Sequence, residues 1–102
     1  MNTLVVRSGQ QRNDHRLIVF RFTVKVDGQW IILTSLKVHE DSTAQIGFDG
    51  TVTLASGIHV LQLEFNTISN VQSIRLDVTK TDNPNNNVVV NEIIPEHREV
   101  KL

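Results

Sequence analysis

Two runs of β-branched and aromatic residues, joined by an Asp-Gly dipeptide, constrain the fold of this chain more than any other feature. The first run covers Arg16–Val26, and the second covers Gln29–Val38. Asp-Gly between two such runs is the strongest short-range signal for a β-hairpin. The sequence therefore predicts a long hairpin, with the remaining shorter strands packed against it.

The alternation of apolar residues predicts the turn of this hairpin. A two-residue turn places Val26 opposite Gln29 and sets apolar residues beside polar ones along both arms. A three-residue loop instead places Phe22 opposite Ile32. A slip of one residue moves every side chain to the other face, and each large apolar side chain left outside costs roughly 1.5–3 kcal/mol. We therefore predict the three-residue loop, with Gly28 as a left-handed bulge.

Two further turns follow the same reasoning. The apolar residues before and after the Asp-Gly at 49–50 all occupy even positions, which predicts a three-residue loop from 48 to 50. The apolar residues before the Ser-Gly at 56–57 occupy even positions and those after it odd positions, which predicts a two-residue hairpin loop that pairs Val52 with Leu61. The parity also assigns all phenylalanines to the core: Phe20, Phe22, Phe48 and Phe65.

The rest of the chain predicts further strands, because no stretch has the 3.6-residue apolar period of a helix. The expected ranges are Asn2–Ser8, Gln45–Phe48, Thr51–Ala55, Ile58–Asn66, Val71–Lys80 and Val88–Ile94. The first of these is expected at a sheet edge. About eight short strands with frequent turns predict an all-β antiparallel sandwich or jelly roll, with a closed β-barrel as the alternative.

Length and composition predict one domain and exclude several classes of protein. The 102 residues suffice for a single core, which we place in residues 1–94, followed by a charged tail at 95–102. A net charge of −1 argues against a dedicated nucleic-acid or anionic-membrane binder. No apolar run is long enough to span a membrane. The absence of cysteine and of a signal peptide favours a cytoplasmic location, unless the chain is an excised module of a larger protein.

No residue pattern indicates catalysis, a metal or a cofactor. The four histidines lack the spacing of metal ligands, and His39 with Glu40 and Asp41 is expected to form a surface loop. The loop from Asp82 to Asn87 is rich in oxygen ligands, but only Asp82 is charged. A calcium site usually needs several carboxylates, so we expect a solvated turn. The sequence therefore predicts a non-enzymatic protein.

The second face of the hairpin provides the main indication of function. It carries four apolar residues that a sheet with one buried face would not need, together with one arginine. These residues are Leu17, Val19, Arg21, Ile31 and Leu33. Exposed apolar patches typically mark interaction sites. We therefore expect a binding or assembly module that docks a protein partner, or a second copy of itself, through an apolar sheet face or a strand edge.

A carbohydrate-binding sandwich is the alternative, since an aromatic ring can stack on the apolar face of a sugar. The chain has one tryptophan, and two polar loops could supply hydrogen bonds to the hydroxyl groups. The candidate ligand-binding residues are Trp30, Arg12, Asp14, His15, Asp82 and Asn85. This alternative requires that the Trp30 ring be exposed.

Overall fold

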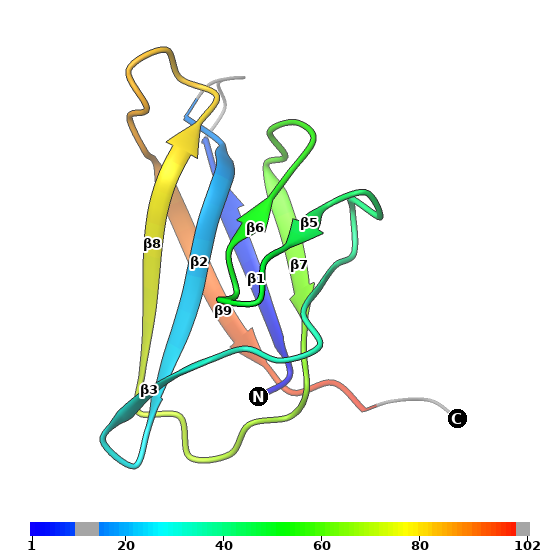
Figure 1. Ribbon diagram of the computed structural model, residues 1–102, viewed down its shortest axis with the longest axis vertical. Helices are drawn as coiled ribbons and strands as arrows, with labels where there is room; N and C mark the ends of the chain where they lie inside the picture. The colour runs from blue at the N-terminus through cyan, green and yellow to red at the C-terminus, as the bar shows by residue number, and fades with distance from the viewer. Residues whose placement is uncertain (10–14, 100–102) are drawn as a thin grey trace.

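The computed structural model describes residues 1–9 and 15–99, which form nine β-strands and no helix (Figure 1). The strands are β1 (Thr3–Ser8), β2 (Leu17–Val26), β3 (Gln29–Ile32), β4 (Lys37–Val38), β5 (Gln45–Ile46), β6 (Val52–Thr53), β7 (Val60–Glu64), β8 (Ser73–Thr81) and β9 (Val90–Glu96). Among the described residues, therefore, no helix is long and apolar enough to cross a membrane.

The strands form two antiparallel sheets packed together. Sheet A has the order β4-β7-β1-β9. Sheet B has the order β3-β2-β6-β5, and β8 pairs with the other edge of β2. Each sheet buries its apolar face against the other, as in other sandwiches. The predicted all-β sandwich is confirmed, and the fold is not a closed barrel.

The core lies between the sheets and is centred on β2. The rings of Phe20 and Phe22 meet edge to face, with centroids 6.0 Å apart, a geometry that aromatic pairs favour. The same buried cluster contains four fully buried residues of sheet A: Leu4, Val6, Leu61 and Leu63. The long first arm of the predicted hairpin therefore supplies the centre of the fold.

An irregularity in β2 changes which of its side chains face the core. Leu17 and Phe20 are both fully buried, although a regular strand sends residues three apart to opposite faces. The register against β8 shifts between these two residues. Their partners on β8, Thr81 and Val78, have the same spacing of three. The irregularity therefore turns Leu17 inward, which alternation alone did not predict.

The first strand is central rather than at an edge, so that expectation was wrong. β1 pairs with β7 on one side and with β9 on the other. Its residues Leu4 to Val6 are all buried, because both the facing sheet and the neighbouring strands cover them. Both partner strands lie more than fifty residues away in the chain, and no local pattern encodes pairings of that length.

The first hairpin has a two-residue turn, so the predicted three-residue loop was wrong. Val26 lies opposite Gln29, and Asp27 and Gly28 have φ angles of 51° and 78°, as in a type I′ turn. The side chains of Trp30–Ile32 are all exposed. Because β3 contributes little to the core, neither register of the hairpin buries more apolar surface of β3 than the other. The intrinsic preference of Asp-Gly therefore sets the turn.

The second Asp-Gly turn has the predicted register, with Ile46 opposite Val52. Gly50 has a φ of 85°, and its N–H donates to the carbonyl of Gly47 at 3.0 Å. The core assignment of Phe48 was wrong, because its side chain is 99% exposed. Parity describes only side chains on a sheet, and Phe48 belongs to the turn.

The predicted hairpin around residues 56–57 does not form. Val52 pairs with Phe20 in sheet B, whereas Leu61 pairs with Val6 in sheet A. The chain therefore changes sheet after β6. Val52 and Leu61 are both apolar because each faces the core from its own sheet, and not because the two residues are neighbours.

The last two strands follow the prediction with a shifted end. β8 alternates as expected, and Ile74, Leu76 and Val78 pack against the core. β9 continues through Pro95 and Glu96, into the segment predicted as a charged tail. Proline is tolerated there because β9 is an edge strand. Residues 100–102 of that tail lie outside the described part of the chain.

Candidate interaction surface

The two-residue turn places two large side chains of β3 on the outer face of sheet B. Trp30 lies opposite Lys25, and Ile32 lies opposite Thr23. Residues that face each other across antiparallel strands share a face of the sheet. Thr23 and Lys25 flank the fully buried Val24 in sequence, so their side chains point away from the core. Trp30 is 47% exposed and Ile32 is 40% exposed.

Phe48 belongs to a turn that adjoins β3. A Cβ atom added at Gly50 would lie 3.6 Å from the Cβ of Ile32, so this turn packs beside the end of β3. Phe48 itself projects into solvent. We call the exposed apolar side chains on the outer face of β3 and in this turn the hairpin surface; it comprises Trp30, Ile32 and Phe48. Clusters of exposed large apolar residues typically mark sites of interaction.

Charged side chains flank the hairpin surface. Nη1 of Arg21 lies 3.9 Å from Oδ2 of Asp49, and its Nη2 lies 3.7 Å from Oδ2 of Asp77. Hydrogen bonds from Thr51 lower the pKa of Asp49, and the charge of Arg21 acts in the same direction. These exposed ion pairs add little stability, but they place both signs of charge beside the apolar residues.

The five residues of the predicted interface lie in different environments. Leu17 and Leu33 are buried in the core of their own chain, so they are not available to a partner. Val19 and Arg21 are half-buried, and only Ile31 is exposed. The predicted cluster of surplus apolar side chains therefore does not form on one open face.

Sequence reasoning missed the outward positions of Trp30 and Ile32. The one-residue error in the turn moved each of them to the wrong face. The signal that would have found them is the Asp-Gly dipeptide at 27–28, which by itself favours a two-residue type I′ turn. Trp30 is exposed, as the carbohydrate alternative requires.

The candidate ligand-binding residues do not meet in one site. His15 lies just before β2 and Asp82 lies just after β8, whereas Trp30 lies opposite Lys25, near the other end of β2. The length of β2 separates Trp30 from His15 and Asp82 by roughly 30 Å. His15 Nε2 is 3.1 Å from Nδ2 of Asn83, in the same loop as Asn85. Two members of the set lie outside the described residues: Arg12 and Asp14.

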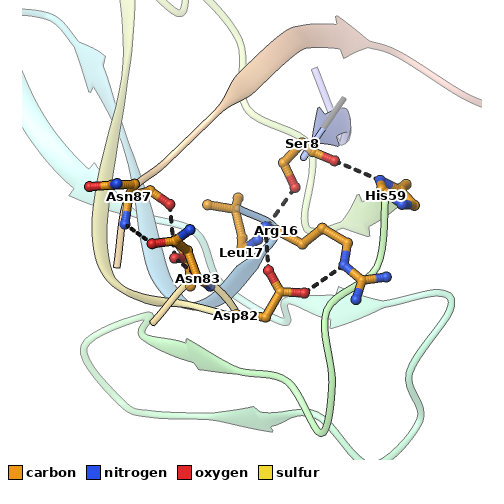
Figure 2. Close-up of polar contacts among 8 residues, drawn as sticks. Ser8, Arg16, Leu17, His59, Asp82, Asn83 and Asn87 are labelled. Atoms are coloured by element: carbon orange, nitrogen blue, oxygen red, sulfur yellow. Dashed lines mark hydrogen bonds and ion pairs between the residues drawn. The ribbon is translucent and has the colours of Figure 1, made fainter. Parts of the chain in front are cut away.

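The side-chain oxygen atoms of Asp82 and Asn83 accept hydrogen bonds within the protein (Figure 2). Oδ1 of Asp82 accepts a hydrogen bond from the backbone N–H of Arg16 at 2.7 Å, and Oδ2 accepts one from its Nε at 2.6 Å. Oδ1 of Asn83 accepts from the backbone N–H groups of Asn85 and Asn87. Asp82 therefore fixes the loop to the start of β2, and Asn83 holds the loop's own backbone.

A serine and a histidine also lie near the start of β2 (Figure 2). The backbone N–H of Leu17 donates to Oγ of Ser8 at 3.4 Å. Nδ1 of His59 lies 3.1 Å from the carbonyl oxygen of Ser8, rather than from its hydroxyl. These contacts tie β1, β2 and β7 together, and they do not form the nucleophile-and-base pair of a hydrolase.

Two shallow hollows lie at the open sides of the sandwich. One, of about 420 Å³, lies between the start of β8 and Pro95 and is largely apolar. The other, of about 390 Å³, lies between β4 and β5. Asp41 lines the second hollow, but its carboxylate accepts hydrogen bonds from Thr43 and Ala55. In the described ranges, no three histidine or acidic side chains gather closely enough to hold a metal ion.

Comparison of the chain with protein-family models, curated proteins and solved structures finds no match. Since one fold can support many functions, function has to be inferred from the surfaces themselves.

Proposed function

We propose that this protein is a non-catalytic binding module that docks a protein partner through the hairpin surface. The supporting observation is that Trp30 and Ile32 lie on the same outer face of β3 and are each more than one-third exposed. Large apolar side chains, and tryptophan above all, dominate the binding energy of protein interfaces. Two large apolar side chains next to each other on one exposed face are typical of an interaction site.

The backbone of β3 supports the same role. Among the described strands, β3 pairs only with β2, so its other edge has no strand partner. An extended partner segment can add to such an edge through main-chain hydrogen bonds, while pockets or apolar patches select its side chains. Gln29 to Ile32 would supply the edge, and Phe48 would supply a further contact at one end.

A displayed library of random peptides tests this proposal without knowledge of the natural partner. We expect the unchanged protein to enrich apolar peptides. The double substitution W30K/I32K should weaken binding of those peptides by at least about tenfold, because it removes the apolar anchors. Thr53→Lys is the matched control, since it adds a lysine at another exposed position of sheet B.

Urea unfolding of each variant checks that the fold is retained. Equal peptide binding by W30K/I32K and by the unchanged protein would overturn the proposal, as would a library that yields no binder.

A carbohydrate-binding function is the second candidate, and the exposure of Trp30 favours it. The 82–87 loop lies beside the start of β2, away from Trp30, and cannot assist. Lys25 and Gln29 would therefore have to bind the sugar hydroxyls. Because Trp30 is the sole tryptophan, its fluorescence reports directly on this surface. A change on titration with an oligosaccharide panel would support sugar binding, and an unchanged spectrum across the panel would remove it.

A further inference from the structure

The longest open strand edge in the described structure belongs to β8. This strand has nine residues and pairs only with β2, so its outer edge has no strand partner (Figure 1). The other edge strands of sheet B, β3 and β5, have four and two residues. In sheet A, β4 has two residues and β9 contains Pro95, which cannot donate a hydrogen bond. Long open edges pair readily with other strands.

The sequence of β8 is a chemical palindrome about Leu76. Reading outward from this residue, Arg75 mirrors Asp77, and the next positions, 74 and 78, are both β-branched and apolar. The third positions, 73 and 79, are both hydroxyl residues. In an antiparallel pair of identical strands, position i of one copy faces the mirror position of the other. The palindrome therefore makes the strand complementary to itself.

We propose that a second copy of this chain pairs with β8 in an antiparallel register centred on Leu76. The two copies are then related by a two-fold axis, which is the commonest symmetry of homodimers. Sheet B becomes continuous across the dimer. This surface is separate from the hairpin surface, so the inference goes beyond the proposed function and does not depend on it.

The charges select this register over its neighbours. Centred on Leu76, each Arg75 faces Asp77 of the other copy, which gives two opposite-charge pairs. Centring on Arg75 or on Asp77 instead places identical charges opposite each other, which is destabilising. A shift of the register by one residue places the core-facing residues of one strand opposite the solvent-facing residues of the other. Apolar side chains are then exposed.

In the single chain, Arg75 and Asp77 contact each other, and dimerisation would exchange this contact for the same contact between copies. Nε of Arg75 lies 3.2 Å from Oδ1 of its own Asp77, and the arginine side chain is 59% exposed. Oδ2 of Asp77 is buried and lies 3.7 Å from Arg21. The exchange therefore takes place at Oδ1, where the guanidinium of Arg75 from a second copy replaces that of its own chain as a charge-assisted donor.

The inner face of β8 gives the dimer an apolar component. Ile74, Leu76 and Val78 pack against the core but are only partly buried. A second β8 covers this row with the same residues. Lys80, the charge that would oppose edge pairing, lies outside the self-complementary segment of 73–79.

Two single charge reversals and their mixture test the register. In a dimer of Arg75→Glu, the introduced glutamate of one copy faces Asp77 of the other. In a dimer of Asp77→Lys, the introduced lysine faces Arg75. Like charges then face each other, so each variant should dimerise at least about tenfold more weakly. In an equimolar mixture, every cross-copy pair has opposite charges again, and dimerisation should return. Variants that had merely lost stability would not rescue each other. Lys80→Glu is the control and should dimerise normally.

Light scattering after size exclusion provides the measurement, with a monomer of 11.5 kDa and a dimer of twice that mass. A purely monomeric protein at millimolar concentration would overturn the proposal, as would a dimer that neither reversal weakens or that mixing does not restore.

Cysteine substitution then fixes the register, because the chain contains no cysteine. Leu76→Cys should form a disulfide-linked dimer under mild oxidation. Ile74→Cys and Val78→Cys should link far better when mixed than when alone. If Ile74→Cys alone formed as much disulfide-linked dimer as the mixture does, a register centred on Leu76 would be overturned. The W30K/I32K variant should dimerise normally, so failure of the hairpin surface and failure of the β8 dimer are distinguishable.

Discussion

Val26 lies directly opposite Gln29, with only Asp27 and Gly28 between the two strands. This single relationship decides which side chains of β3 meet solvent, because opposite residues share a face. It directs Trp30 outward beside Lys25. The candidate binding surface is therefore a consequence of turn chemistry at two residues.

Gly28→Ala should destabilise the protein. Gly28 has a φ of 78°, and an L-residue with a Cβ pays roughly 1–2 kcal/mol in this left-handed conformation. Nothing else lies near the added methyl group, so steric contact with neighbours will not contribute. Urea unfolding measures the loss. A Gly28→Ala protein as stable as the unchanged one would show that the turn does not hold the type I′ conformation.

Phe48 and Phe65 should respond in opposite ways to truncation. Phe65 is buried, and Phe65→Ala should cost about 3–5 kcal/mol in unfolding free energy. Phe48 is fully exposed, so Phe48→Ala should change stability by less than about 0.5 kcal/mol. Chemical denaturation of the two variants side by side makes the comparison. A large loss for Phe48→Ala would place its ring in the core, as alternation had suggested.

Asp82→Asn should lower the unfolding free energy by about 1–3 kcal/mol, because it weakens charge-assisted hydrogen bonds to a partly buried Arg16. The same bonds already occupy both carboxylate oxygens. The midpoint temperature of unfolding of the unchanged protein should therefore be the same in millimolar calcium as in EDTA. A calcium-dependent rise in the midpoint would show that the 82–87 loop binds the ion after all.

Asp41 should make stability fall in acid. Hydrogen bonds from the Thr43 side chain and the Ala55 backbone lower the pKa of Asp41 below its ordinary value of 3.8. A lowered pKa means that the folded state favours the ionised form, so the stabilisation is complete above the ordinary value and is lost as pH falls through the folded one. Asp41→Asn should thus be less stable at neutral pH.

Urea unfolding of Asp41→Asn and of the unchanged protein over a range of acidic pH values tests this assignment. The difference between the two should shrink as the pH falls. A difference that stays constant from neutral to strongly acidic pH would contradict the role given to the carboxylate.

Alternation predicted the fold class because most strands bury one face. In β8, Ile74, Leu76 and Val78 do pack inward between polar neighbours, and the strand follows from the sequence with little error. The same reasoning failed at β3, since a strand that lies outside the core has no buried face to impose a register. It also failed at Phe48, which lies in a turn.

The candidate site was less predictable than the fold. The burial of Leu17 depends on an irregularity shared with β8, and the position of β1 depends on partners far along the chain. Neither leaves a local trace in sequence. The palindrome around Leu76 is visible in the sequence, but its meaning depends on knowing that β8 is an open edge.

The central position of β1 bears on how the protein is made. Thr3 to Ser8 pair with β7 and β9, and Leu4 and Val6 are fully buried. During synthesis β1 leaves the ribosome before either of its neighbours, and β9 follows it by more than eighty residues. Folding of sheet A must therefore wait until β9 has been made, and such non-local pairing is slow. Until then β1 stays open to chaperones or to mispairing.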